Sequence, residues 1–327
     1  MRPTPPQTFY DQIAANRRNS VLLILVVAAL FAALGFSIGF GTTGEAATGL
    51  VVLGGAVGLA GLMSAGSYFA GDSLVLSAAR ARPVSEQDAP QLMNVVRELA
   101  IAANVPLPKV YIIDDTAPNA FATGRDPQHA SVAITTGLLQ KLDREELQGV
   151  IGHELAHVRN LDIRFTLLVA VLVGSIALLA DMFLRMTYWG GGRSRGNRDG
   201  GGGAQALVFL FAIVLAILAP IAARLVQLAV SRQREYLADA SSVELTRNPY
   251  GLQRALVKIA SDQEVLEVAN RATQHLYIVN PIKKFEARAR GLFSTHPPTI
   301  ERINRLRALT GQPPLDEPAA EAVARLD

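Results

Sequence analysis

The 327-residue sequence contains no cysteine. Disulfide bonds, thiolate metal sites and a cysteine nucleophile are therefore excluded, and any bound metal must be held by His, Asp or Glu. Charged residues are also few, at 18% against roughly 25% in an average soluble domain, whereas 50% of the residues are hydrophobic and the mean hydropathy is +0.26. The formal net charge of +3 gives no case for a nucleic-acid partner. The composition predicts a membrane protein with a folded aqueous part.

Two long uncharged segments lie near the start of the chain, at Ser20–Phe40 and Ala46–Gly71. Each is long enough to cross a hydrocarbon core of about 30 Å as a helix that rises about 1.5 Å per residue. Arg17 and Arg18 precede the first segment, and the link 41–45 contains neither Lys nor Arg. The positive-inside rule therefore predicts a transmembrane hairpin with both ends in the cytoplasm. A cleaved signal peptide is disfavoured, because the first segment exceeds the roughly 7–15-residue apolar core of such peptides.

Two later apolar segments, Phe165–Ala180 and Leu207–Ala223, are at or below the length of about 17 residues that a spanning helix needs. Asp181 and Arg185 stand four residues apart and can pair on one helix face, which favours crossing. The arginines of the glycine-rich loop 190–203 oppose it, because crossing would place them on the non-cytoplasmic side. A second transmembrane hairpin is therefore expected, with a buried hairpin as the alternative. The sequence divides into a cytoplasmic N-terminal segment (1–19), a transmembrane hairpin (20–71), the first part of a cytoplasmic domain (72–164), the second apolar hairpin (165–230) and the second part of that domain with a proline-rich tail (231–327).

The stretch between the apolar hairpins has both helical and strand patterns. Apolar residues at helical spacing from Leu92 to Leu99 predict an amphipathic helix. Asp143 followed by Glu146 has the pattern of a capping box, which predicts a helix from there to about Asn160. Strands are predicted at Lys109–Ile113, Ala120–Thr123 and Ser131–Thr135, and further helices at Arg232–Glu244, Tyr250–Ile259 and Thr299–Leu309.

The helix that follows Asp143 carries the most informative motif of the chain, His153-Glu154-Leu155-Ala156-His157. Residues four apart lie on one helix face, so both imidazoles can hold one zinc ion while Glu154 reaches the water at that ion. A catalytic zinc site needs a third protein ligand and one open position. The motif therefore predicts half of a zinc peptidase site.

The third ligand must come from elsewhere in the chain. A metzincin would have Gly and His at positions 160 and 163, but this sequence has Asn160 and Ile163. The other common choice is a glutamate on a later helix, and Glu235 is well placed after the fourth apolar segment. Asp239 lies one turn further on the same face and would accept the Nδ1 proton of a ligating histidine. The alternative for both carboxylates is a solvated helix face.

This ligand set constrains the membrane topology. His153 and His157 precede the third apolar segment, whereas Glu235 follows the fourth, so the two segments must return to the side on which they start. The site is then cytoplasmic whether or not the second hairpin crosses. A site inside the bilayer is disfavoured, because charged residues flank the motif on both sides.

Several motifs together resemble one known family. They are the segments Pro118–Gly124, Ile134–Leu138, His153–His157, Glu235–Asp239 and His296–Pro298. Over nearly the whole chain, the sequence resembles the HtpX-type membrane zinc metalloproteases of bacteria, relatives of the endopeptidases that trim prenylated CaaX proteins. The resemblance implies a mainly α integral membrane protein with an α+β zincin-like protease domain, in which a small sheet accompanies the HExxH helix. It also implies Glu235 as third zinc ligand and a role in stress response and protein quality control.

Two further sites are suggested by the residues and by this resemblance. Small side chains around Phe121 would let Asn119, Ala120, Phe121 and Ala122 form an edge strand to which a substrate peptide adds, the alternative being a loop beside the core. The resemblance suggests that His296 donates to the developing oxyanion or contacts substrate, the alternative being a surface residue at a turn.

The sequence thus predicts a zinc metalloendopeptidase of the inner or plasma membrane that takes one Zn²⁺ per chain. Its partners would be the lipid bilayer and protein or peptide substrates, misfolded or membrane proteins among them, with no nucleic acid. His153, His157 and Glu235 would hold the metal, and Glu154 would move the proton. A catalytically silent membrane scaffold with a protease-like fold is the alternative, but such a protein has no need of Glu154.

Overall fold

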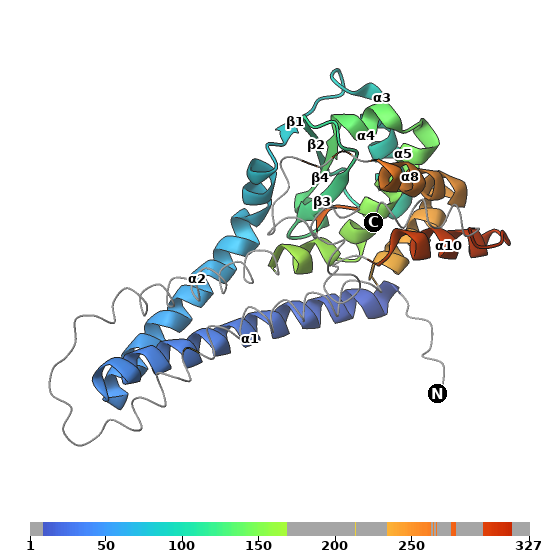
Figure 1. The fold of residues 1–327 in the computed structure, drawn as a ribbon. Coiled ribbons are helices and arrows are strands. Elements are labelled where there is room, and N and C mark those ends of the chain that lie inside the picture. The colour runs from blue at the N-terminus through green and yellow to red at the C-terminus, as the bar shows by residue number, and fades with distance from the viewer. Residues whose placement is uncertain are drawn as a thin grey trace. The chain divides into compact units, whose positions relative to one another are not determined.

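The computed structural model describes residues 9–168, 213, 234–262, 264, 266, 276–278 and 297–315 (Figure 1). The fourth apolar segment except for one residue, most of the third, loop 190–203 and His296 lie outside the described residues. The chain divides into two compact units, one formed by residues 1–17, 70–167 and 228–327, the other by 18–69 and 168–227. Each unit is described by itself.

Two long helices dominate the described part of the second unit. They are α1 (Phe9–Thr43) and α2 (Ala46–Ala78), and they contain the two apolar segments expected to span a membrane. Arg18–Gly41 and Ala46–Ala78 are long and apolar enough to do so, with mean hydropathies of 2.9 and 1.9. A Cβ atom placed on Gly35 would lie 2.7 Å from Cβ of Ala56. Such close approach over small residues is typical of helix pairs in membranes.

The first unit is built on a four-stranded mixed sheet of order β1-β2-β4-β3. Its strands are β1 (Arg82–Pro83), β2 (Lys109–Ile113), β3 (Ala120–Gly124) and β4 (Ala130–Thr135). β2 and β4 are parallel, whereas β1 pairs antiparallel with β2 and β3 pairs antiparallel with β4. The three strands predicted from the sequence are therefore present, and β3 lies at an edge of the sheet as expected.

Helices pack around this sheet and around one another. They are α3 (Pro90–Ala103), the short α4 (Thr136–Lys141), α5 (Arg144–Arg159), α8 (Pro249–Ser261) and α10 (Thr299–Leu309), with a 3-10 turn η1 at Pro127–His129. Residues 162–168 and 234–246 are also helical. α5 packs against α3, α8 and β3, and α10 packs against α8. The result is a mostly helical protein with a small mixed sheet and two candidate membrane helices.

Two features set the position of α5, a cap at its start and a close contact with α8. The carboxylate of Asp143 accepts from the backbone N–H of Glu146 at 2.9 Å, and Glu146 Oε2 accepts from the N–H of Asp143 at 2.9 Å. This confirms the predicted capping box, which satisfies two backbone donors at the helix start. Gly149 then lets α8 approach closely, because a Cβ atom there would lie 2.6 Å from Cα of Leu252. α5 ends at Arg159, and Asn160 is its C-terminal cap.

Candidate metal and catalytic site

The two histidines of the motif meet on the buried face of α5. His153 and His157 are one turn apart, and their Nε2 atoms are separated by 3.2 Å. Their rings are perpendicular, with centroids 4.7 Å apart. His153 is buried, with 1% of its surface exposed. The helical spacing predicted from the sequence therefore brings both imidazoles to one point.

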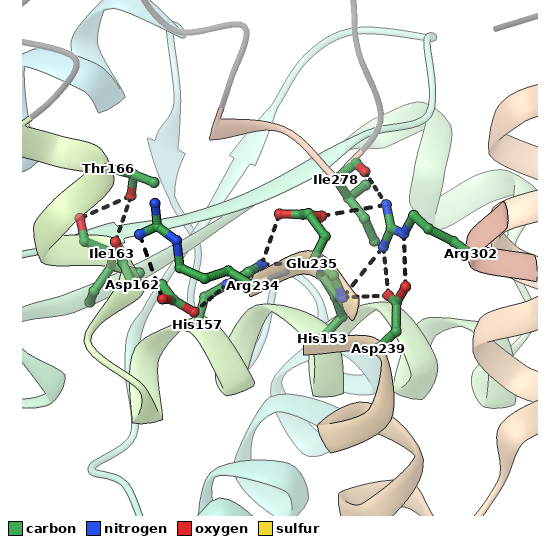
Figure 2. A network of polar contacts seen from close by, with 10 residues as sticks. All are labelled: His153, His157, Asp162, Ile163, Thr166, Arg234, Glu235, Asp239, Ile278 and Arg302. Carbon is green, nitrogen blue, oxygen red and sulfur yellow. Dashed lines mark hydrogen bonds and ion pairs between the residues drawn. The ribbon is translucent and has the colours of Figure 1, made fainter. Parts of the chain in front are cut away.

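The helical segment 234–246 brings a carboxylate to the same point (Figure 2). Glu235 Oε2 lies 3.6 Å from Nε2 of His153, and Oε1 lies 3.5 Å from Nε2 of His157. One ligand atom from each of the three residues lies within 4.8 Å of the others. All three belong to the first unit, although Glu235 is far from the histidines in sequence.

Each histidine also contacts a carboxylate through its other ring nitrogen. Nδ1 of His153 lies 2.9 Å from Oδ1 of Asp239, and Nδ1 of His157 lies 2.9 Å from Oδ2 of Asp162. An ionised carboxylate can only accept, so these contacts place a ring proton on Nδ1 and leave Nε2 of each ring to take up either a metal ion or a second proton. Two Nε2 atoms and the Glu235 carboxylate then converge, and such a set suits a cation.

The charges around His153 favour a positive charge at this point. Burial by itself lowers the pKa of His153, but the carboxylates of Asp239 and Glu235 outweigh burial and raise the pKa to about 9. Burial likewise tends to raise the pKa of Asp239, yet Arg302 and His153 hold that pKa below its usual value. A proton or a metal cation can supply the positive charge that these carboxylates stabilise.

Glu154 lies beside this cluster but differs from it in environment. It is buried, and burial raises the pKa of its carboxyl, although His153 and His157 act in the opposite direction. The backbone of Ala122 in β3 hydrogen-bonds to it. Burial makes this carboxyl easier to protonate than an exposed one, which suits a group that takes up and releases a proton.

The edge strand β3 is only partly as expected. Phe121 is fully buried, and its ring packs edge-on against Tyr277 at a centroid distance of 5.1 Å, so this side chain serves the core. Asn119 is also buried, and its N–H donates to Oγ1 of Thr135 at 2.9 Å. Residue 278 lies alongside the strand, where the N–H of Ile278 donates to the carbonyl of Ala120 at 2.9 Å. Ala120 is thus already paired on the side away from β4.

A family model for peptidase family M48 matches residues 86–310. The chain belongs to peptidase family M48. Curated relatives include a protein named Protease HtpX homolog from Streptococcus gordonii, which is 45% identical over 300 residues and covers 92% of this chain and 99% of the relative. Another of that name, from Syntrophobacter fumaroxidans, is 49% identical over 277 residues, with 81% and 96% covered. The crystal structure of S. mikatae Ste24p is 20% identical, with a TM-score of 0.45, over 76% of this chain and 57% of that one.

Membership of family M48, together with the relatives named Protease HtpX homolog, confirms the HtpX-type resemblance. The M48 protein is a membrane metalloprotease that hydrolyses peptide bonds, and its substrates are proteins or peptides. The cluster of His153, His157 and Glu235 is the group within the described residues whose spacing suits a metal ion.

Two parts of this M48 site were missed by the sequence reasoning. Asp162 follows α5 through a turn in which Leu161 has a φ of 61°, a conformation that costs a non-glycine residue about 1–3 kcal/mol. Arg302 is fully buried and contacts Asp239 with two nitrogens. A signal for Arg302 was present, because it occupies the apolar stripe of α10 together with Ile303 and Leu306.

Proposed function

We propose that the protein is a zinc-dependent endopeptidase in which His153, His157 and Glu235 hold one Zn²⁺ per chain. The observation that carries this proposal is the convergence of the three ligand atoms within 4.8 Å, with the protons of both histidines directed to Asp239 and Asp162. Nitrogen and oxygen donors in a set of two His and one Glu are typical of catalytic zinc, which keeps a fourth position open. The arrangement is the one expected for a zincin-like domain.

The chemistry divides between the metal and this chain's own residues. When bound, the zinc ion would polarise the scissile carbonyl and make the attacking water more acidic. Glu154 takes the proton from that water and later gives it to the leaving amine, a role that its buried carboxyl with a raised pKa supports. Asp239 and Asp162 keep the two rings in the orientation and tautomer that ligation requires. These roles favour the enzyme over a catalytically silent scaffold.

The substrate peptide is proposed to add to the edge of β3. Extended peptides add to exposed sheet edges through backbone hydrogen bonds, and Ala122 in this strand contacts Glu154. Of the predicted residues, Asn119, Ala120 and Phe121 have partners within the core of the fold, whereas the backbone of Ala122 bonds Glu154, so the substrate contact is proposed at Ala122, beside the carboxyl that moves the proton. His296 stays a prediction as donor to the developing oxyanion, because it lies outside the described residues.

The active site is proposed to face the cytoplasm of a multi-pass protein in the inner or plasma membrane. The arginines before the first apolar segment and the absence of Lys and Arg in the link 41–45 support this orientation. Misfolded and membrane proteins are then the proposed substrates, in a quality-control role. Relatives named Protease HtpX homolog are consistent with such a membrane protease.

Metal analysis tests the proposal directly. The full-length chain, purified in detergent, is expected to contain one zinc per chain and to degrade casein, an unfolded test protein. A chelator is expected to remove both zinc and activity, and added zinc should restore both. His157→Ala should lose zinc, whereas His129→Ala is a matched control, because His129 is an exposed histidine paired with Asp126 outside the cluster. Full activity of a zinc-free preparation would exclude the zinc mechanism.

A further inference from the structure

Arg302 is an arginine buried in the first unit with 0% of its surface exposed. It stands on α10, more than sixty residues after Glu235, and no motif of the sequence points to it. A buried guanidinium is costly unless opposite charges and hydrogen bonds compensate it. The partners of Arg302 therefore indicate what the charge does there.

One set of partners belongs to the metal cluster (Figure 2). Nε of Arg302 donates to Oδ2 of Asp239 at 2.9 Å, and Nη2 donates to Oδ1 at 2.7 Å. Such a two-point contact fixes the plane of the carboxylate, which a single donor cannot do. The same Oδ1 lies 2.9 Å from Nδ1 of His153. Nη1 of Arg302 also lies 3.6 Å from Oε2 of Glu235. The guanidinium thus fixes the carboxylate that orients one histidine.

The other partner belongs to the side of the sheet on which we place the substrate. Nη1 of Arg302 donates to the carbonyl of Ile278 at 2.7 Å. The N–H of the same residue donates to the carbonyl of Ala120 in β3 at 2.9 Å. Tyr277, the preceding residue, packs against Phe121 of that strand. Arg302 therefore holds residues 277–278 against the edge of β3.

We propose that Arg302 is a positioning residue that joins the metal cluster to the substrate-binding edge of β3 and sets their separation. The inference rests on the proposed function, since it needs the zinc ligands and the substrate edge assigned there. The carbonyl of Ala120 already accepts a hydrogen bond from the N–H of Ile278. A substrate strand must therefore pair with β3 beyond Ala120, in the direction of Ala122. The register of the peptide over Glu154 is then set by the contact that Arg302 makes with Ile278.

The two connections can be separated by substitution. Asp239→Asn weakens the connection to His153 but leaves Ile278 in place. Ile278→Pro removes the N–H that bonds Ala120 and leaves Asp239 in place. Arg302→Lys keeps the charge but cannot make the two-point contact with Asp239 and the bond to Ile278 at the same time. This variant therefore affects both connections. Arg307→Met is the matched control, because Arg307 lies on the same helix and bonds the carbonyl of Pro313 away from the site.

Two properties of each full-length variant are measured. The first is zinc retention against a competing chelator, and the second is KM and kcat for casein at saturating zinc. A melting curve confirms that each variant is folded. Asp239→Asn is expected to weaken zinc retention by about 10–100-fold with little change in KM. Ile278→Pro should raise KM several-fold with unchanged zinc retention. Arg302→Lys should show both effects, and Arg307→Met neither.

A merely structural role for Arg302 predicts a lower melting temperature with wild-type zinc retention and wild-type KM in the folded protein. That result for Arg302→Lys would overturn the inference. If Arg302→Lys does not fold, Ile278→Pro decides, because an unchanged KM would show that the edge contact has no part in substrate placement. If instead the wild-type protein works without zinc, the proposed function itself has failed.

Discussion

The carboxylate of Asp162 lies 2.9 Å from Nδ1 of His157, and so gives the second histidine of α5 the partner that Asp239 gives the first. Asp162 follows α5 directly, whereas Asp239 comes from the later helical segment 234–246. Each is in turn close to a buried arginine, with Arg302 bonded to Asp239 and Nη1 of Arg234 3.7 Å from Oδ1 of Asp162. The ring orientation of both proposed ligands thus depends on charges from outside α5.

Asp162→Ala is expected to weaken zinc binding by about 10–100-fold, because His157 loses the acceptor that fixes its ring and tautomer. Zinc retention during titration with a chelator measures the effect. Asp126→Ala is the control, since Asp126 also bonds a histidine, His129, but lies outside the cluster. Equal zinc retention by the two variants would show that Asp162 does not support ligation.

Glu154→Gln is expected to lower kcat by about 10²–10⁴-fold while zinc stays bound. The substitution removes the proton acceptor but leaves His153, His157 and Glu235 in place. Casein hydrolysis and zinc content, measured on one preparation, separate the two effects. Wild-type turnover by this variant would be incompatible with the proposed mechanism.

Glu235→Ala is expected to lower zinc occupancy more than Asp239→Ala does. Glu235 places its carboxylate oxygens 3.5 and 3.6 Å from the two Nε2 atoms, whereas Asp239 acts through Nδ1 of His153. Metal analysis after dialysis compares the two proteins. Full occupancy in the Glu235 variant would mean that the third ligand is another residue.

Gly149→Ala is expected to destabilise the first unit by about 1–3 kcal/mol, the usual cost of overpacking. The new methyl group would lie 2.6 Å from Cα of Leu252, which is backbone and cannot rotate away. A lower melting temperature in detergent would report the loss. Gly58→Ala serves as control, because a Cβ atom there meets nothing within 4 Å.

Gly200→Cys is expected to react with an impermeant thiol reagent added outside intact cells, whereas Ser85→Cys stays protected until the cells are permeabilised. The chain contains no cysteine, so each variant carries a single thiol. The prediction follows from the proposed cytoplasmic location of the first unit and from the expectation that the second hairpin crosses. Protection of both positions would mean that the second hairpin does not cross, and labelling of Ser85→Cys would reverse the proposed orientation.

The pairing of His153 with His157, and of Glu235 with Asp239, could be predicted from the sequence because each pair shares a regular helix, whereas the meeting of the two pairs was implied by the family resemblance. Spacing by four residues places side chains on one face whatever the rest of the fold does. The limits of α5 and α10 were predictable for a similar reason, since capping and apolar periodicity are local signals.

Asp162 and Arg302 could not be placed in that way. Asp162 reaches His157 only because Leu161 adopts a positive φ, for which leucine gives no signal. Arg302 stands in the apolar stripe of α10 with Ile303 and Leu306, which indicates that it is buried but not what it contacts. Its contacts with Asp239 and Ile278 follow from the tertiary packing of α10, which the pattern along one helix does not report. The two-residue strand β1 is likewise too short for a periodic pattern.

The proposed ligands come from two stretches of chain that are separated by residues 168–227, and Arg302 follows later still. During translation, α5 therefore leaves the ribosome long before Glu235 exists, and synthesis at about 5–20 residues per second makes this delay several seconds. A nascent chain at that stage holds two of the three proposed ligands and lacks a complete centre. If Glu235 is the third ligand as proposed, the order of synthesis keeps the peptidase inactive until the second apolar hairpin has been made, and a product truncated before Glu235 is expected to be inert.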